Sequence, residues 1–284
     1  MTAEVSTGLI VETVSDLSDL PVREPVAAQG DPFADLAEAS AEEVIDWSYA
    51  SFHPSLAIIT AFQAEGMVLI DMAARRHRDV RVLTVDTGRL PQETYDLMDE
   101  VRSRYGIIVE VIFPDPGHVE SMVERHGLNL FRHDPALRQL CCEVRKVFPF
   151  ERAVGHVDAY FSGLRRSQGV TRTETPKVQL DGRFAGKTKI SPLADWTPDQ
   201  VWEYIHEFKV PYHHLYDRGY TSIGCAPCTR AVAPGQAERS GRWWWEPEEG
   251  KECGIHKESR DERLQQELKW LGEATATPHG ARAT

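Results

Sequence analysis

Five cysteines carry the most reactive side chains of this sequence, and they fall into three groups. Cys141 and Cys142 are adjacent, Cys225 and Cys228 form a Cys-x-x-Cys pair, and Cys253 stands alone near the C-terminus. Adjacent cysteines and an odd total are untypical of a secreted disulfide framework, whereas such groups in a reducing cytosol bind metal or perform thiol chemistry. The cysteines are therefore the first place to look for function.

Four of the thiols suit a metal centre. Cys141-Cys142 and the pair in Cys225-Ala-Pro-Cys228 could hold a tetrahedral zinc ion or a cubane iron-sulfur cluster. Adjacent cysteines chelate one small ion awkwardly, whereas a cluster offers separate irons, so the spacing favours [4Fe-4S]. Arg145 and Lys146 follow at once, and such cations would offset the charge of about −2 of a four-thiolate cluster. A solvated helix face explains this basic pair equally well.

Cys253 is a candidate nucleophile. A thiolate is the reactive form, and Lys251, His256 and Lys257 would lower the pKa of this thiol, while Glu252 opposes them. A lone exposed cysteine is more often inert. A flexible segment with a reactive thiol nevertheless suits an enzyme that hands its intermediate to a second protein.

Alternating apolar segments predict the elements that hold these groups in place. Short runs rich in β-branched residues alternate with stretches of helical period. This order implies right-handed crossovers and an α/β fold, with a mostly parallel sheet and helices on both faces. Strands are expected at residues 55–62, 80–85, 107–113 and 159–163, and helices at 67–74 and 91–105.

Capping signals predict further helices. Ser40 and Glu43 form a capping box that starts a helix. The sequence Thr197-Pro-Asp-Gln200 combines an N-cap, a proline at the first helical position and a capping-box glutamine, so a helix is expected over 201–208. A short charged helix is expected around 261–271.

Composition divides the chain and excludes several functions. Residues 1–39 are acidic and are expected to be a mobile leader, residues 40–240 the α/β domain, and residues 241–284 a flexible C-terminal arm. A net charge of −12 argues against a broad surface for nucleic acid or anionic lipid. Apolar runs are too short to cross a bilayer, and no signal-peptide pattern is present. We therefore expect a cytoplasmic protein. The sequence does not fix its oligomeric state, and a homo-oligomer is one of the possible states.

Three segments follow predicted strands at the edge where parallel sheets bind ligands. They could offer backbone amides and guanidinium groups to a phosphate or sulfate. Each alone could equally be an ordinary turn with surface arginines. The candidate ligand-binding residues are Phe62, Gln63, Ala64 and Glu65, then Asp86, Thr87, Gly88 and Arg89, and finally Gly163, Leu164 and Arg165 with Arg166 beside them.

Three cysteine motifs, in this order, resemble those of the PAPS/APS reductase family, and most closely its thioredoxin-dependent assimilatory adenylyl-sulfate (APS) reductases. The resemblance spans roughly residues 40–260. The motifs are Cys-Cys-Glu-Val-Arg-Lys at 141–146, Gly-Cys-Ala-Pro-Cys-Thr-Arg at 224–230 and Glu-Cys-Gly-Ile-His at 252–256, with supporting matches at 85–89, 163–165, 191–197 and 241–246.

This resemblance implies a fold, a cofactor and a reaction. The fold would be similar to the adenine nucleotide α-hydrolase, or pyrophosphatase-loop, group, and Cys141, Cys142, Cys225 and Cys228 would hold a [4Fe-4S] cluster. Cys253, with His256 in its motif, would attack the sulfur of APS, expel AMP and become an S-sulfocysteine. Thioredoxin or a similar dithiol would then release sulfite, for sulfate assimilation and cysteine biosynthesis. The cluster would not be the electron source.

Cations must neutralise both anions as thiolate and phosphosulfate approach each other. By analogy with the family, Lys146 is nearest the sulfate. One departure concerns the turn at 62–66, which is usually richer in serine and glycine and whose side-chain contacts are therefore open. The other cations considered are Arg89, Arg165, Arg166, Arg239 and Arg242.

Three other functions compete with this one. A PAPS reductase, or an enzyme of dual substrate use, shares the nucleophile and the thiol step, but PAPS-specific members of the family generally lack the four cluster cysteines. A tRNA thiolation enzyme also joins an adenylate site to cysteine chemistry, yet the acidic charge weighs against nucleic acid. In a zinc scaffold Cys253 would be incidental.

Overall fold

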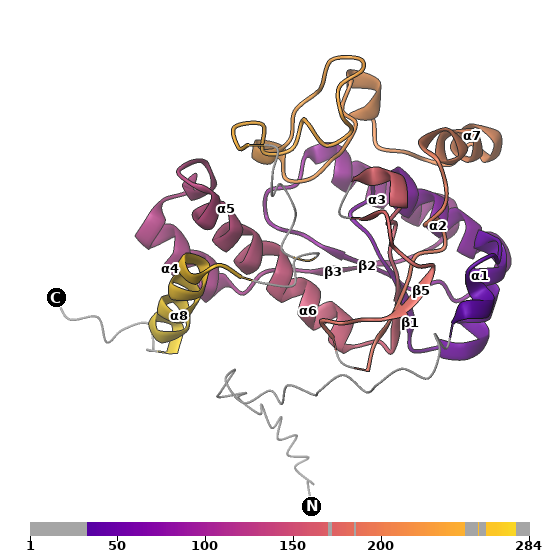
Figure 1. Ribbon diagram of the computed structural model, residues 1–284, viewed down its shortest axis with the longest axis horizontal. Coiled ribbons are helices and arrows are strands. Elements are labelled where there is room, and N and C mark those ends of the chain that lie inside the picture. Colours follow the sequence, from indigo (N-terminus) through magenta and orange to yellow (C-terminus); the bar gives the residue numbers. More distant parts are fainter. Residues whose placement is uncertain (1–32, 170–171, 185, 248–254, 256–259, 277–284) are drawn as a thin grey trace, which may run out of the picture.

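A six-stranded sheet in the order β3-β2-β1-β4-β6-β5 forms the centre of the computed structural model (Figure 1). The structure describes residues 33–169, 172–184, 186–247, 255 and 260–276. All neighbouring strands run parallel except β5, which is antiparallel to β6, so the mostly parallel sheet is confirmed. The strands are β1 (Leu56–Ile59), β2 (Val82–Val85), β3 (Val109–Ile112), β4 (Ala159–Phe161), β5 (Val178–Leu180) and β6 (Thr188–Ile190).

The helices follow local signals in the sequence. The capping box of Ser40 with Glu43 and that of Thr197 with Gln200 are both formed, which confirms two predicted helix starts. The helices are α1 (Ala41–Phe52), α2 (Ala64–Arg76), α3 (Gln92–Tyr105), α4 (Pro116–His126), α5 (Pro135–Cys142), α6 (Phe148–Gly155), α7 (Pro198–Phe208) and α8 (Glu262–Ala276). Two shorter elements matter for the site: the π-helix η3 (Glu143–Val147) and the 3-10 helix η7 (Ala226–Cys228).

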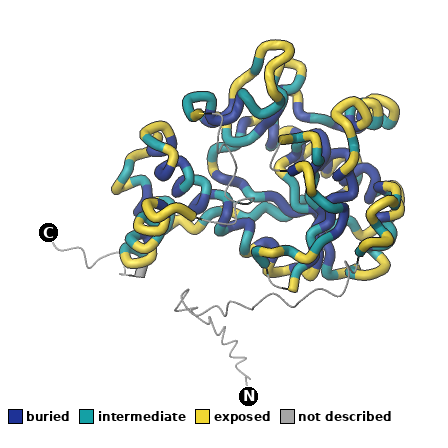
Figure 2. Tube along the Cα trace, in the orientation of Figure 1, coloured by how far each residue is buried: buried dark blue, intermediate teal, exposed yellow. Residues whose placement is uncertain are grey.

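Helices cover both faces of the sheet, as predicted. Successive side chains of a strand point to opposite faces. Leu56 and Ile58 of β1 pack in a core with α1, α2 and α7, whereas Ala57 between them packs with Phe150 and Ala153 of α6. Figure 2 shows the resulting buried centre, with the exposed residues on the outer helices and loops.

A separate apolar cluster lies beside the sheet, among α4, α5 and α8. Leu264 and Leu271 of α8 are each 2% exposed and pack with Leu137 and Leu140 of α5. Figure 1 shows α8 in yellow against these two helices. The predicted charged helix near the C-terminus is therefore present, and it is docked on the domain.

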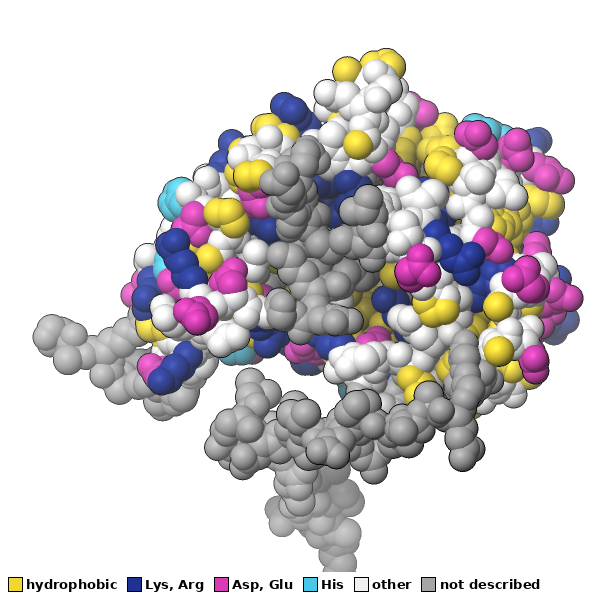
Figure 3. Space-filling view, viewed as in Figure 1, with side chains coloured by type: hydrophobic (Ala, Val, Ile, Leu, Met, Phe, Trp, Pro, Cys, Tyr) yellow, Lys and Arg dark blue, Asp and Glu magenta, His cyan; other side chains and the backbone are white. Residues whose placement is uncertain are grey.

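Both kinds of charge are present on one face of the molecule. On the face drawn in Figure 3, Lys and Arg side chains are interspersed with Asp and Glu. None of the helices in the described ranges combines the length and the apolar character that crossing a bilayer requires.

Candidate active site

An open cavity lies at the carboxyl ends of β1, β2 and β4. Ligands of parallel α/β sheets bind at this edge, where strand ends meet helix N-termini. We call it the strand-end cavity. The predicted site residues that line it are Gln63, Glu65, Thr87, Lys146, Gly163, Leu164, Arg239 and Arg242.

The turn between β1 and α2 presents the N-terminus of α2 to this cavity. Phe62 lies in the left-handed region, with φ 57°, which is rare for a bulky residue and recurs at functional turns. Gly66 allows close packing, because a Cβ there would stand 1.9 Å from Thr60 Oγ1. Gln63, Glu65 and Gly66 line the cavity, so the dipole of the first helical turn favours an anion at this end.

Two predicted residues of this turn do not line the strand-end cavity. Phe62 is fully buried in the core shared with α1 and α2. The amide of Ala64 donates to the Tyr216 hydroxyl at 3.2 Å, beside a second groove on the far side of the helix end. Gln63 does line the cavity, but its Oε1 accepts from the amide of Ile223 at 2.9 Å and so anchors the loop that precedes η7.

In the turn after β2, some residues stabilise the turn itself and others face the strand-end cavity. Asp86 is 6% exposed, and its carboxylate accepts from the Gly88 amide at 2.7 Å and from the Tyr95 hydroxyl at 3.0 Å. Gly88 has φ 69°, a conformation that favours glycine. Asp86 therefore shapes the turn, whereas Thr87 faces the strand-end cavity.

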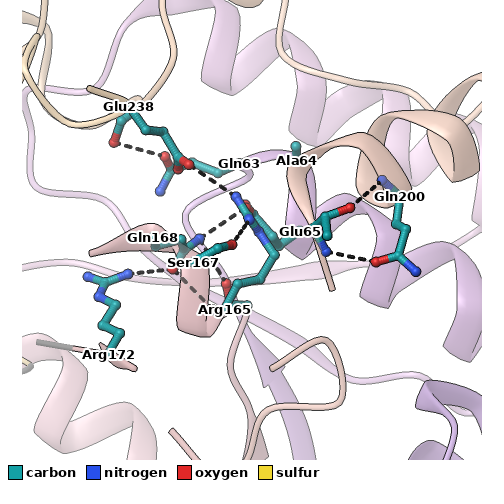
Figure 4. A network of polar contacts seen from close by, with 12 residues as sticks. Gln63, Ala64, Glu65, Arg165, Ser167, Gln168, Arg172, Gln200 and Glu238 are labelled. Atoms are coloured by element: carbon teal, nitrogen blue, oxygen red, sulfur yellow. Dashed lines mark hydrogen bonds and ion pairs between the residues drawn. The ribbon is translucent and has the colours of Figure 1, made fainter. Parts of the chain in front are cut away.

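Arg165 lies in a buried network rather than on the strand-end cavity (Figure 4). Its Nε donates to Glu65 Oε1 at 2.7 Å, its Nη2 to Glu238 Oε2 at 3.2 Å and its Nη1 to Ser167 Oγ at 2.6 Å. Gln168 Nε2 also donates to Glu65 Oε1, at 2.9 Å. Burial and the Glu65 charge raise the pKa of Glu238, and Arg165 opposes this shift. Contact between Arg165 and substrate remains a prediction.

Replacing Arg165 by leucine is expected to lower the free energy of unfolding by about 3 kcal/mol. The reason is that two carboxylates, Glu65 and Glu238, would lose their buried cation. The measurement is urea denaturation. The matched control is Arg218→Leu, which breaks an exposed pair with Glu93 and should cost less than about 1 kcal/mol. Equal costs at the two sites would contradict a stabilising role of the buried network.

Sequence reasoning missed two cations of the strand-end cavity. Arg172 and Lys189 line it together with Lys146, Arg239 and Arg242. Lys189 lies on β6, which pairs in parallel with β4, so recognition of that strand would have placed it near the site. Five cations on one cavity of a chain with net charge −12 indicate a local anion-binding site.

Arg242 is held where a glycine makes room for it. Its side chain is nearly buried, and its Nη1 donates to the Ile223 carbonyl at 3.2 Å. Any Cβ at Gly224 would stand 2.3 Å from Arg242 Nη2. Within the described part of the chain, Arg242 Nε has no hydrogen-bond partner, although it is buried. A guanidinium N–H is thus available to an anion.

The four cysteines of the first two motifs line a second, smaller cavity, the cysteine cavity. Cys141 and Cys142 end α5, while Cys225 and Cys228 bracket η7. The tertiary fold therefore brings together two motifs that are more than eighty residues apart in sequence. The cationic residues on the same cavity are Arg89, Arg138, Arg145, Lys146 and Arg242.

Burial of the cysteine cavity affects the pKa values of its thiols. Burial and the neighbouring thiols raise the pKa of Cys141 and of Cys228 to about 12. Within the described ranges, no three His, Cys, Asp or Glu side chains are arranged to hold a metal ion. All four cysteines nevertheless line one cavity.

The strand-end and cysteine cavities adjoin. Thr87, Lys146, Cys225 and Arg242 line both of them. Thr87 Oγ1 lies 3.3 Å from Cys225 Sγ, and the Thr87 carbonyl accepts from Arg145 Nη1 at 2.9 Å. Arg145 and Lys146 belong to η3, and π-helical turns recur at functional sites. A ligand in the strand-end cavity would therefore lie next to the cysteines.

Trp243 supplies an unused hydrogen-bond donor at the cysteine cavity. It is 2% exposed and lines the cavity, and its Nε1 has no partner among the residues described. The Arg138 guanidinium lies 4.5 Å from the centre of its ring, and Arg138 also pairs with Glu246. Buried donors are rarely left unpaired in proteins. This N–H therefore fits an acceptor, such as a sulfur, held inside the cavity.

Cys253 and His256, the predicted catalytic residues, lie outside the described part of the chain. Ile255, from the same motif, is described. It lines the strand-end cavity together with Lys146 and packs near Phe150. One position of the motif therefore contacts the cavity that the cations surround.

Comparisons with known proteins agree on one family. The family model described as phosphoadenosine phosphosulfate reductase domain matches residues 55–231. Adenosine 5'-phosphosulfate reductase of Allochromatium vinosum is 45% identical over 203 residues, covering 72% of this chain and 79% of its own. The protein of that name from Pseudomonas aeruginosa is 42% identical over 226 residues, with 78% and 84% covered. A crystal structure of phosphoadenylyl-sulfate reductase from Candida auris, a phosphate complex, matches with TM-score 0.58, 32% identity, and 69% and 92% covered.

Proposed function

Because the chain belongs to the phosphoadenosine phosphosulfate reductase domain family, we propose that it reduces adenylyl sulfate to sulfite and AMP with thioredoxin or a similar dithiol. The observation that carries this proposal is the pair of adjoining cavities, one rich in cations and one lined by four cysteines. The relatives named adenosine 5'-phosphosulfate reductase support this substrate over PAPS. The reaction requires the dithiol in its reduced form, and a reducing cytoplasm would maintain that form.

The chemistry is a two-step transfer at Cys253. The thiolate attacks the sulfur of the phosphosulfate, an S–S bond forms, the S–O bond to phosphate breaks, and AMP leaves with that oxygen. A dithiol thiolate then attacks Cys253 Sγ and sulfite departs. The second thiol of the reductant resolves the mixed disulfide, so the dithiol supplies two electrons and Cys253 returns as a thiol.

The cations of the strand-end cavity make the first step feasible. Both reactants are anions, and the leaving AMP gains charge as the S–O bond breaks. Lys146, Arg239 and Arg242 line the cavity, and the first turn of α2 faces the same space. Positive groups fixed before reaction stabilise the developing charge without reorganisation.

The residues of the cysteine cavity fit a [4Fe-4S] cluster. Cys141, Cys142, Cys225 and Cys228 would hold it; the unpaired Trp243 N–H and the surrounding guanidinium groups suit a buried anionic sulfur cage. Bound, the cluster would supply a fixed charge of about −2 beside Lys146. Electrons in the proposed reaction come from the dithiol.

An anaerobic assay with reduced thioredoxin, supplying APS and PAPS separately, tests the proposed function. We expect sulfite from APS at a rate at least about tenfold above that from PAPS, because relatives of this chain are named adenosine 5'-phosphosulfate reductase. Preference for PAPS would keep the mechanism and reject the substrate. No sulfite from either compound, with a full complement of iron, would reject the activity.

A further inference from the structure

Two ion pairs tie both flanks of the segment 247–259 to one continuous helical stretch. Before the segment, Glu246 pairs in two parallel bonds with Arg138 of α5, each 3.0 Å long. After it, Arg260 Nη2 donates to Glu143 Oε2 at 2.8 Å, and Glu143 begins η3 directly after α5. Arg138 and Glu143 are five residues apart, or about 7.5 Å along a helix. The stretch they lie on also carries Cys141 and Cys142.

Helix α8 restricts the position of Arg260, which forms the second of these ion pairs. Its Leu264 and Leu271 are buried against α4 and α5. Glu267 lies 3.0 Å from His126 Nε2 of α4, and Arg263 lies 2.8 Å from Asp134, the N-cap of α5. Arg260 stands two residues before α8, so the docked helix limits how far Arg260 can move from Glu143.

The buried carboxylate of Glu143 requires a cation close to it. Its side chain is only 3% exposed, and Arg260 Nη2 approaches it more closely than Arg183 Nη2, which is 4.0 Å away. A buried carboxylate that loses its nearest cation is strongly disfavoured. The pair therefore holds Arg260 beside the cysteine-bearing helix.

We propose that the Arg260–Glu143 pair, with α8 behind it, is a positioning device for the Cys253 thiol. Cys253 precedes Arg260 by seven residues, and Ile255 between them lines the strand-end cavity. Restricting both flanks of a short segment raises the effective concentration of any group it carries. Arg260 thus speeds attack by the thiol on bound substrate without touching substrate. The catalytic part of this inference rests on the proposed function; the anchoring part does not.

The first test measures anchoring without activity. Trypsin cleavage after Lys251 and Lys257, followed by mass spectrometry, is compared among wild type, Arg260→Gln, Arg260→Lys and Arg263→Gln. We expect cleavage about tenfold faster in Arg260→Gln, and close to the wild-type rate in Arg260→Lys, which keeps the charge. Arg263→Gln is the matched control, since Arg263 pairs with α5 but does not touch Glu143. Equal acceleration in both glutamine variants, or none in Arg260→Gln, would overturn the anchoring role.

The second test separates the two steps of the reaction. In single turnovers at saturating APS, Arg260→Gln should form the S-sulfocysteine about tenfold more slowly, with unchanged APS affinity and unchanged discharge by the dithiol. Arg260→Lys should restore most of the rate. A normal rate in Arg260→Gln despite faster trypsin cleavage would overturn the positioning role. If wild type forms no S-sulfocysteine at all, the proposed function fails, and the trypsin comparison still decides the anchoring.

Discussion

Sulfite release is expected to fall to the background reaction of APS with dithiol when Cys253, the proposed nucleophile, is replaced by serine. The hydroxyl of serine stays protonated at neutral pH, so the variant lacks a thiolate to attack the phosphosulfate. The measurement is sulfite formation under anaerobic conditions with reduced thioredoxin. The intermediate should be lost with it, so mass spectrometry should find no sulfonated chain.

Iron content and APS binding of the Cys253→Ser variant serve as controls for this prediction. Cys253 does not belong to the four cysteines of the cysteine cavity, so iron content should equal that of wild type. Binding of APS should also persist, because the cations of the strand-end cavity are unchanged. Substantial turnover by Cys253→Ser would remove the nucleophile assignment, whereas loss of iron would mean that the substitution acts through the cofactor.

Replacing Cys228 by alanine is expected to remove the proposed cluster and the proposed activity together. Cys228 is 7% exposed and lines the cavity with the other three cysteines, so its thiol lies where the proposed cluster would be held. Iron should fall from about four per chain to near zero, with loss of the brown colour. Iron analysis and visible absorption measure this directly.

The matched control for this variant is Thr229→Ser at the next position. Thr229 Oγ1 donates to the Cys225 carbonyl at 3.0 Å, and serine keeps that hydroxyl, so iron should be retained. A full complement of iron in Cys228→Ala would reject the proposed ligand set. Stoichiometric zinc in a colourless wild-type protein would favour the zinc scaffold instead.

Much of the fold could be predicted because its signals are local. The capping boxes of Ser40 and Thr197 join groups three residues apart, and the alternation of strands with helices follows from short apolar periods. Strands β5 and β6, which follow β4 at one end of the sheet, were not predicted. Each has a polar residue at its centre, Gln179 or Lys189, so neither forms a continuous apolar run.

The residues that line the strand-end cavity could be predicted from the sequence only in part. Turn motifs correctly located the edge of the sheet, and Thr87 and Lys146 do line the cavity there. The partner of each side chain could not be predicted, because an arginine near a strand end can contact either a ligand or a carboxylate. Arg165 pairs with Glu65, one hundred residues away, and no local pattern indicates that choice.

The sequence by itself determined the α/β alternation, the family and the set of reactive thiols, because these depend on short patterns and on side-chain type. Only the tertiary structure decided that Arg172 and Lys189 join the cations of the strand-end cavity, and that α8 docks beside the cysteine-bearing helix. Such contacts arise from packing between distant segments. Burial makes them strong, since a buried charge without its partner is costly, yet nothing local in the chain encodes them.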